Sequence, residues 1–557
     1  MNRSFLAVVV MWVLFGFPAS AQVSPRSLVF ESIDVRVVNI DVVVTDGDGK
    51  RVLGLTKDDF ELFEEKKPQS ITNFSEIRLG TPARTAAEPQ GDAVPASESA
   101  EPPPRRFVLF VDNYSLHPQT RNRLIPSLEK FVKEHVRPDD LVSVVGWSRQ
   151  LEIIQPLTTD KSRVVKAIRG LAEGSSPMAV RNELQRIQKP CMDVLQMAKS
   201  SQLPMLAAYN ECIGAVRIET AATVASSRQL LNAINIALGT MSGMEGRKVR
   251  VLAGALLPQR PGFELFQWAN AQFAPYMRGF DAATAREGDD ARKQREMIEK
   301  LGKSANAQGV TLYLIAASTT ADPMNVETAD MKVDQGAGFL HMGNTEAAYE
   351  TLANRTGGLV VKQPLDMEKA FDLIAEDLTS YYSLGYRPTG NDRADREIVV
   401  RTKNRAYRAR ARQSFALKTA DDQFTDRVVA NVFAPLPPSE IPVTLISGPP
   451  KKEGGNFVVP VEISIPATIT LLPDGSMLGG GFAVYIAVGN AQGAMSTTFR
   501  QPNPVRIPAA EEKAFRSTPL RFTASLTLRP GENFLSVGVV DQVSNTSGFA
   551  RKTIVAK

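Results

Sequence analysis

The sequence is poor in the residues that hold transition metals and redox centres. Its 557 residues include three histidines and two cysteines. A zinc site of His and Cys ligands, a haem attached through CxxCH and an iron–sulfur cluster need these residues in numbers or at spacings that the chain lacks. Catalysis by a Ser/His/Asp triad would depend on His117, His135 or His341.

The sequence also lacks a strong net charge and a run of 18 or more apolar residues. Its 43% hydrophobic and 22% charged residues are typical of folded proteins, which excludes collagen, a coiled coil and bulk disorder. The longest apolar run, Phe5–Phe17, has 13 residues and lies between Arg3 and the small residues Ala19-Ser20-Ala21. Thirteen helical residues span about 20 Å, which is too short for a hydrocarbon core of about 30 Å.

This run predicts a signal peptide, 1–21, cleaved between Ala21 and Gln22. We therefore expect an exported mature chain, periplasmic or extracellular, without a transmembrane anchor. Loss of Arg3 lowers the formal net charge from +5 to +4, which does not indicate binding to nucleic acid. In an oxidising compartment, Cys191 and Cys212 are expected to form a disulfide, and two buried free thiols are the alternative.

Residues 22–79 are expected to form an N-terminal β domain. Its segment 33–45 alternates strongly and precedes the turn sequence DGDGK, which is typical of strands. Residues 80–104, rich in Pro, Ala, Ser and Glu, predict a disordered linker. A β-meander is expected at 381–417, and we expect its strands to pair with those of the N-terminal β domain.

Residues 105–380 predict a doubly wound α/β domain with a parallel sheet, because buried strand patterns alternate with helical ones. The expected strands are 107–111, 141–147, 248–257, 310–318 and 359–362. The alternation is interrupted by 177–213, expected to be a disulfide-tied helical insertion followed by a separate helix at 214–241. Two further interruptions are an irregular segment, 258–292, and a Gly-rich loop, 320–345.

Residues 418–557 hold several strand patterns separated by Pro, Gly and Asn turns and no convincing helix. They predict a C-terminal β-sandwich. The expected fold class is therefore multidomain α/β plus β, with a doubly wound domain flanked by Ig-like β domains.

The α/β region resembles a von Willebrand factor A domain. The resemblance rests on a first strand that ends in Asp112 and on the phrases RPDDLVSVVGWS, LTTDKSRVVKAIRGL and GVTLYLI. The flanking phrases VVNIDVVVTDGDGK and YYSLGYRP are similar to those of the acidobacterial family of secreted von Willebrand factor A-related proteins. The resemblance covers residues 30–415.

In von Willebrand factor A domains the first strand normally ends in DxSxS, and a threonine and an aspartate from later loops complete a divalent-cation site for a partner's carboxylate. Here Tyr114 and Leu116 occupy the two serine positions. The resemblance leaves Asp112, Ser115 and Ser176 as oxygen donors of a degenerate site that holds at most weak magnesium or calcium. The alternative is that Asp112 caps a turn or the next helix.

Three further residues, Asn113, Tyr114 and His117, follow the first strand at the edge where open α/β sheets bind ligands, so they are candidates for a ligand-contacting face. His341 and the pair Asp139-Asp140 lie in no catalytic motif. A basic run predicts either a site for an anionic glycan or surface, or a solvated strand face; its residues are Arg401, Lys403, Arg405, Arg408, Arg410 and Arg412.

These features predict a secreted, non-enzymatic protein of the binding or adhesion type. Its expected partner is a protein or a component of the matrix or envelope. Two alternatives remain: an envelope hydrolase or other enzyme with its site in the insertion or the β domains, and a structural scaffold of an envelope assembly.

Overall fold

The computed structural model divides the chain into two compact units, Val37–Lys418 and Thr419–Lys557, and each is considered by itself. The predicted signal peptide and nearly all of the predicted linker lie outside the described residues. Those residues are 37–78, 104–116, 118–173, 183–241, 244, 246–254, 257–277, 289–317, 335–362, 364, 366–388, 395–416, 419–433, 440–490 and 495–557.

The α/β part of the first unit is built on a six-stranded sheet with the order β10-β9-β8-β5-β6-β7. Five strands are parallel, and β7 runs antiparallel to β6, so the prediction of a wholly parallel sheet is wrong at this edge. The connection Ser148–Gln150 is too short for the crossover that parallel strands need. The strands are β5 (Arg106–Asp112), β6 (Leu141–Trp147), β7 (Leu151–Thr158), β8 (Lys248–Gly254), β9 (Val310–Ala316) and β10 (Val360–Lys362).

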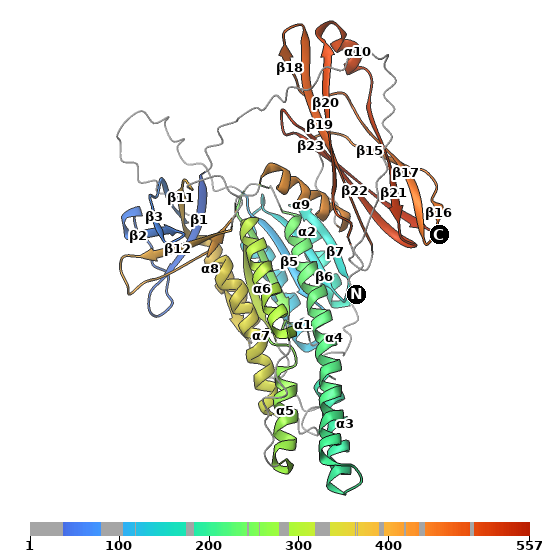
Figure 1. Cartoon of the computed structure of the whole chain (residues 1–557). Coiled ribbons are helices and arrows are strands. Elements are labelled where there is room, and N and C mark those ends of the chain that lie inside the picture. Colours follow the sequence, from blue (N-terminus) through green and yellow to red (C-terminus); the bar gives the residue numbers. More distant parts are fainter. Residues whose placement is uncertain are drawn as a thin grey trace. The chain divides into compact units, whose positions relative to one another are not determined.

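Helices cover both faces of this sheet (Figure 1). Alternate residues of β5 enter two separate cores, with Phe107 and Leu109 on one side and Val108 and Phe110 on the other. Because both faces are buried, the strands read as continuous apolar runs. One face is covered by α1 (Pro118–His135), α2 (Lys161–Glu173) and α8 (Met367–Thr379), and the other by α4 (Met205–Gly239), α6 (Asp289–Ala307) and α7 (Gln335–Thr356).

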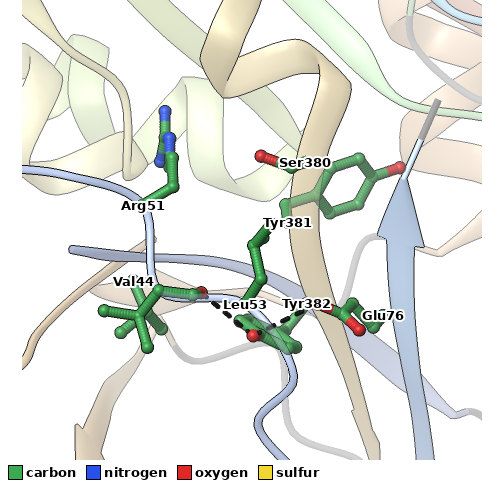
Figure 2. A pocket seen from close by; sticks show the side chains of 8 residues that line it. Val44, Arg51, Leu53, Glu76, Ser380, Tyr381 and Tyr382 are labelled. Carbon is green, nitrogen blue, oxygen red and sulfur yellow. Dashed lines mark hydrogen bonds between the residues drawn. The ribbon is translucent and has the colours of Figure 1, made fainter. Parts of the chain in front are cut away.

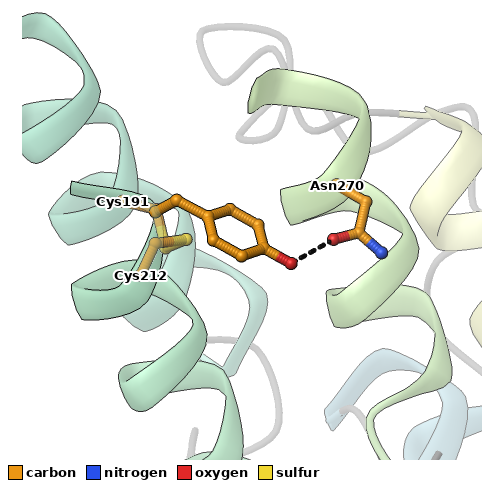
Figure 3. Close-up of a disulfide and its surroundings, with 4 residues drawn as sticks. Cys191, Cys212 and Asn270 are labelled. Atoms are coloured by element: carbon orange, nitrogen blue, oxygen red, sulfur yellow. Dashed lines mark hydrogen bonds between the residues drawn. A yellow bond between two sulfur atoms is a disulfide. The ribbon is translucent and has the colours of Figure 1, made fainter. Parts of the chain in front are cut away.

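A helical arm is formed by α3 (Glu183–Lys199), the N-terminal half of α4 and α5 (Phe263–Phe273), which is followed by the 3-10 turn η3 (Ala274–Tyr276). The predicted disulfide between Cys191 and Cys212 is confirmed and joins α3 to α4 (Figure 3). Next to it, the hydroxyl of Tyr209 donates to Oδ1 of Asn270 on α5 at 3.0 Å.

Three boundaries expected around the arm are wrong. The insertion does not end at residue 213, since α4 runs without a break through this point. The segment expected to be irregular, 258–292, contains α5 and the start of α6, and α7 begins at Gln335 within the expected loop. In α5, the buried residues Leu265, Ala269 and Phe273 recur every four positions, which is the periodicity of a helix that covers a core.

Two segments that lie far apart in the sequence build the β part of the first unit. Its sheets have the orders β13-β1-β11-β4 and β14-β12-β2-β3, so strands of 38–78 and 380–415 pair in both, as we expected of these segments. Side chains of both sheets share one core, which makes this part a β-sandwich. The strands are β1 (Val38–Thr45), β2 (Phe60–Glu64), β3 (Lys67–Gln69), β4 (Asn73–Arg78), β11 (Ser380–Tyr386), β12 (Arg396–Thr402), β13 (Arg408–Ala411) and β14 (Ser414–Phe415), with the 3-10 turn η1 (Lys57–Asp59) before β2.

The second unit consists of two antiparallel sheets around one core. One sheet contains β15 (Thr444–Ser447), β16 (Lys451–Glu453), β17 (Asn456–Ile465) and β21 (Leu520–Leu528). The other contains β18 (Leu471–Asp474), β19 (Met477–Asn490), β20 (Phe499–Pro508), β22 (Gly531–Asp541) and β23 (Ser547–Ala556). The 3-10 turn η6 (Ala509–Glu511) and the short helix α10 (Glu512–Arg516) lie between β20 and β21.

The prediction that this second unit has no helix is wrong, because α9 (Ala420–Phe433) packs on β19 and β22. Its first turn is stabilised by a reciprocal cap: the hydroxyl of Thr419 donates to Asp422 at 2.7 Å, and the Asp422 N–H donates back at 3.1 Å. Phe424, Val428 and Val432, four residues apart, form its buried stripe. In the described part of the chain, no helix is both long and apolar enough to cross a membrane.

Candidate functional site

The sheet of the α/β part reverses its winding between β5 and β8. The chain passes from β5 to β6 and β7 on one side and returns at β8 on the other side of β5. Open α/β sheets bind ligands at the carboxyl ends of the strands at such a switch point. Asp112 ends β5 and Gly254 ends β8, so these two residues mark the candidate site.

Gly254 leaves room for the side chain of Asp112. A Cβ atom on Gly254 would lie 3.3 Å from Oδ2 of Asp112 and 2.9 Å from the hydroxyl of Tyr349. Burial and the nearby charge of Asp112 raise the pKa of Tyr349 far above its ordinary value. The carboxyl group of Asp112 and the neutral phenol of Tyr349 therefore both lie beside Gly254, where a side chain is absent.

The carboxyl group of Asp112 is engaged within the turn that follows β5. Its Oδ1 accepts the N–H groups of Tyr114 and Ser115, each at 3.1 Å, and its Oδ2 accepts the Ser115 hydroxyl at 2.5 Å. Asp112 is 1% exposed. Burial raises its pKa to about 7, although the hydrogen bonds from Ser115 and Tyr114 favour the charged form. Asp112 thus caps this turn.

The two residues at the serine positions of the motif point into opposite cores. Tyr114 packs into the core under α4, α6 and α7, and Leu116 into the core under α1, α2 and α8. Of the three predicted oxygen donors, Asp112 and Ser115 lie in the described turn, where they bind each other. A hard divalent cation takes six or more oxygen ligands, so these two residues alone do not fit one. Ser176 lies outside the described residues, and the metal site stays a prediction.

The candidates for a ligand-contacting face are largely buried. Asn113 is 5% and Tyr114 4% exposed, and the Asn113 amide donates to the carbonyl of Leu171 at 3.4 Å. His117 lies outside the described residues. An exposed group at this edge is Arg149, which donates to the Tyr114 hydroxyl at 2.7 Å and lies over its ring, 4.8 Å from the centroid. Sequence reasoning missed Arg149, because nothing local distinguishes it from other turn arginines.

His341 has a partner that lies far away in the sequence. Its Nδ1 is 2.8 Å from Oε1 of Glu264 on α5, and the Asn344 amide donates to Oε2 of Glu264 at 3.2 Å. Burial acts to raise the pKa of Glu264, but the hydrogen bond and charge of His341 outweigh it and lower this pKa. These hydrogen bonds join α5 to α7. They give His341 a structural role, although it lies in no local sequence motif.

Two arginines of the basic run are structural. The guanidinium of Arg410 donates to Oδ2 of Asp377 on α8 at 2.5 Å and to the carbonyls of Gly357 and Gly358 at 2.9 and 2.6 Å. Arg412 donates to the carbonyl of Asn39. The prediction of a solvated strand face is therefore wrong at these two positions, whereas Arg408 is exposed.

A small hollow lies within the β part, lined by residues of β1, β4 and β11 and by Arg51–Leu53 (Figure 2). It is too small to hold a water molecule. The Tyr382 hydroxyl donates to the carbonyl of Val52 at 3.0 Å and lies 3.4 Å from Oε1 of Glu76, which also accepts Arg78 at 2.8 Å. The carboxylate of Glu76 is already paired, and the hollow is small. It is therefore not the deep pocket that the enzyme alternative requires.

Comparison with known proteins gives only distant similarities. No family model and no curated protein matches the sequence. Among solved structures, the vWF domain of the type V pili tip protein Mfa5 from Porphyromonas gingivalis is 12% identical, covering 50% of this chain and 96% of that chain with a TM-score of 0.27.

Two other structures are similar to the same degree. An aerotolerance-related membrane protein from Bacteroides fragilis is 10% identical, covering 49% of this chain and 98% of that chain with a TM-score of 0.24. The PilB minor pilin from Streptococcus sanguinis is 10% identical, covering 61% of this chain and 87% of that chain with a TM-score of 0.26. Since all three TM-scores lie below 0.5, no conclusion about this chain rests on them.

Proposed function

We propose that this chain is an exported, non-enzymatic binding protein that contacts a protein, matrix or envelope partner. The contact surface is the carboxyl edge of the six-stranded sheet, at the exposed turn that follows β6 and contacts Tyr114 in the turn after β5. The observation that carries the proposal is the turn after β5, in which the acidic group at the switch point caps the backbone. A carboxyl group used in this way shapes a rigid surface and is not free to react.

Arg149 supports the same proposal. Its guanidinium is exposed at this edge and is held over the Tyr114 ring by stacking and by a hydrogen bond. A planar guanidinium can bind a carboxylate through two hydrogen bonds. Because Tyr114 holds the side chain in place, its binding to a partner loses less conformational entropy. Arginine is also among the residues that contribute most to binding energy at protein interfaces.

Site-specific photo-cross-linking in the host's own envelope tests this surface. A photoreactive amino acid replaces Gln150, in the turn after β6, and in a matched variant it replaces Asp139, in the turn before β6 at the opposite edge of the sheet. Both positions are exposed. We expect a discrete adduct from the Gln150 variant that an excess of untagged protein suppresses. Equal adducts from both positions, or none from Gln150, would contradict the proposal.

The contribution of Arg149 is measured with the same adduct. We expect Arg149→Ala to reduce its yield several-fold, because the held guanidinium is lost. Arg163→Ala is the matched control, since it removes a side chain that is 72% exposed on α2. Equal losses in the two variants would mean that Arg149 makes no specific contact.

A further inference from the structure

Strand β21 of the second unit lies at the edge of its sheet. From Leu520 to Leu528 it pairs with β17, and within the described residues no strand pairs with its other side, the outer edge. The register with β17 runs over the nine residues of β21 without a shift, so the strand is regular throughout. A strand edge of this kind can form backbone hydrogen bonds with a second strand.

Ser525 directs its backbone groups toward the outer edge of β21. Its partner on β17 is Pro460, whose carbonyl accepts the N–H of Gly448 at 2.8 Å on the side away from β21. Paired residues of an antiparallel ladder direct their backbone groups either toward each other or both away from each other. The N–H and C=O of Ser525 therefore point outward, and by alternation so do those of Arg521 and Thr527.

The other edge strands of eight or more residues in the described part of the chain carry features that oppose pairing with a further strand. Strand β20 contains three prolines, and β7 contains Pro156 and pairs with β6 through register shifts. Strand β23 carries the charged residues Arg551 and Lys552. Prolines, bulges and charges of this kind protect edge strands from pairing. Strand β21 has no proline, lysine or register shift, and its one charged residue, Arg521, lies near its start.

The inner face of β21 has a similar order of side chains in both directions from Ala524. Phe522 and Leu526 lie two positions away from this alanine, and Leu520 and Leu528 lie four positions away. If a second copy pairs antiparallel about Ala524, the small side chain faces its own copy and each large apolar side chain faces another large one. Matched apolar pairs of this kind stabilise neighbouring strands.

The backbone groups and the charges fit the same register. It places Arg521 opposite Thr527 of the copy, and both residues direct their backbone groups outward, as a hydrogen-bonded pair requires. No charged residue of β21 then lies opposite a like charge. Because the two-fold axis is perpendicular to the sheet, the inner faces of both copies lie on the same side.

We propose that the mature chain forms a two-fold symmetric homodimer in which the β21 strands of two second units pair antiparallel about Ala524. A second copy is the occupant because the strand matches its own reverse in the order of its inner side chains, in the direction of its backbone groups and in charge. The pairing joins the sheets of the two copies into one continuous sheet through an isologous interface.

Sedimentation of the full mature chain between about 1 and 200 µM tests the dimer, because a single strand pair buries an area at the small end of specific interfaces. We expect a concentration-dependent monomer–dimer equilibrium. Thr527→Pro removes an N–H that points away from β17, so the sheet keeps its bonds while the dissociation constant rises at least about tenfold. Thr527→Val, which keeps this N–H, is the matched control and should leave the equilibrium unchanged. A monomer at all concentrations, or a dimer that Thr527→Pro does not weaken, overturns the proposal.

A cysteine cross-link tests the register. Ala524→Cys is expected to yield a disulfide-linked dimer under mild oxidation, because the two copies of this position would have Cα atoms about 4.5 Å apart. Ser525→Cys is the matched control, since the two copies of this neighbouring position would lie diagonally, about 7–8 Å apart. Circular dichroism and an intact Cys191–Cys212 disulfide check that both variants fold. Equal cross-linking at the two positions, or none at Ala524→Cys, overturns the proposed pairing about Ala524.

Discussion

The carboxylate of Asp377, on α8, accepts a hydrogen bond from the guanidinium of Arg410, on β13, with 2.5 Å between Oδ2 and Nη2. Its other oxygen pairs with Arg51, which follows β1. The side chain of Asp377 is 2% exposed. A single buried carboxylate thus joins both segments of the split β-sandwich to the last helix of the α/β part.

Asp377→Asn is expected to lower the free energy of unfolding by about 3–5 kcal/mol, because two arginines would lose the charge that compensates them in a buried place. Urea unfolding of the full chain measures the loss. Asp372→Asn on the same helix is the control, since Asp372 is 58% exposed and 3.7 Å from His135. Its expected effect is below about 1 kcal/mol. Equal effects of the two variants would show that Asp377 does not hold the β-sandwich to α8.

Reduction of the disulfide should weaken the arm. Cys191 and Cys212 close a loop across a sequence separation of 21, for which chain entropy predicts about 3 kcal/mol of stabilisation. We expect a reductant to lower the melting temperature and to speed proteolysis within α3 before the sheet is cut. The double variant C191S/C212S separates the loss of the cross-link from other effects of the reductant. An arm that resists proteolysis equally in both states would contradict this prediction.

Phe424→Ala on α9 is expected to destabilise the second unit by about 3 kcal/mol, because the ring is buried against Tyr485 and Phe549. Hydrogen exchange should quicken in β19 and β22, on which α9 packs. Thr425→Ala on the neighbouring, partly exposed position controls for helix propensity. Unchanged exchange in β19 and β22 would mean that α9 is not part of this core.

The pH dependence of stability should report the buried carboxyl group of Asp112. Its pKa is about 7 in the folded chain against an ordinary 3.8, so the folded state holds the proton more tightly than the unfolded state. The contribution of Asp112 to stability is therefore present in full below pH 3.8 and is lost as pH rises to about 7.

Asp112→Asn removes this titration, so the stability of the original chain relative to the variant should fall over that window. Chemical unfolding of both proteins in the presence of a chelator measures the difference between their free energies of unfolding. The contributions of the other carboxyl groups, which both proteins share, drop out of this difference. A difference that stays constant or rises with pH would contradict the prediction.

Addition of divalent cations tests the degenerate metal site. A bound ion must raise the melting temperature by mass action. Since Asp112 and Ser115 are bonded to each other, we expect millimolar Mg²⁺, Ca²⁺ or Mn²⁺ to leave the melting temperature of the mature chain unchanged. A rise that Asp112→Asn abolishes would instead show that Ser176 and other groups complete a working site.

Local patterns predicted most of the elements that bury a regular face. Continuous apolar runs predicted β5, β6, β8 and β9, since strands covered on both sides need no polar positions. The helical spacing of Phe424, Val428 and Val432 could have predicted α9 in the same way. This helix was missed because the strand pattern of the neighbouring residues was extended over it. For the candidate site, the sequence placed Asp112 at the end of β5, but it did not predict that Tyr114 and Asn113 are buried.

The sequence by itself predicted five of the six strands of the sheet, the pairing of its only two cysteines and the loss of both motif serines, because these follow from residue identity and short-range periodicity. The tertiary structure alone decided which charges meet. Arg410 and Asp377 are 33 residues apart, and Glu264 and His341 77. The folding of intervening helices and strands brings such pairs together, and no local pattern around either residue carries that information.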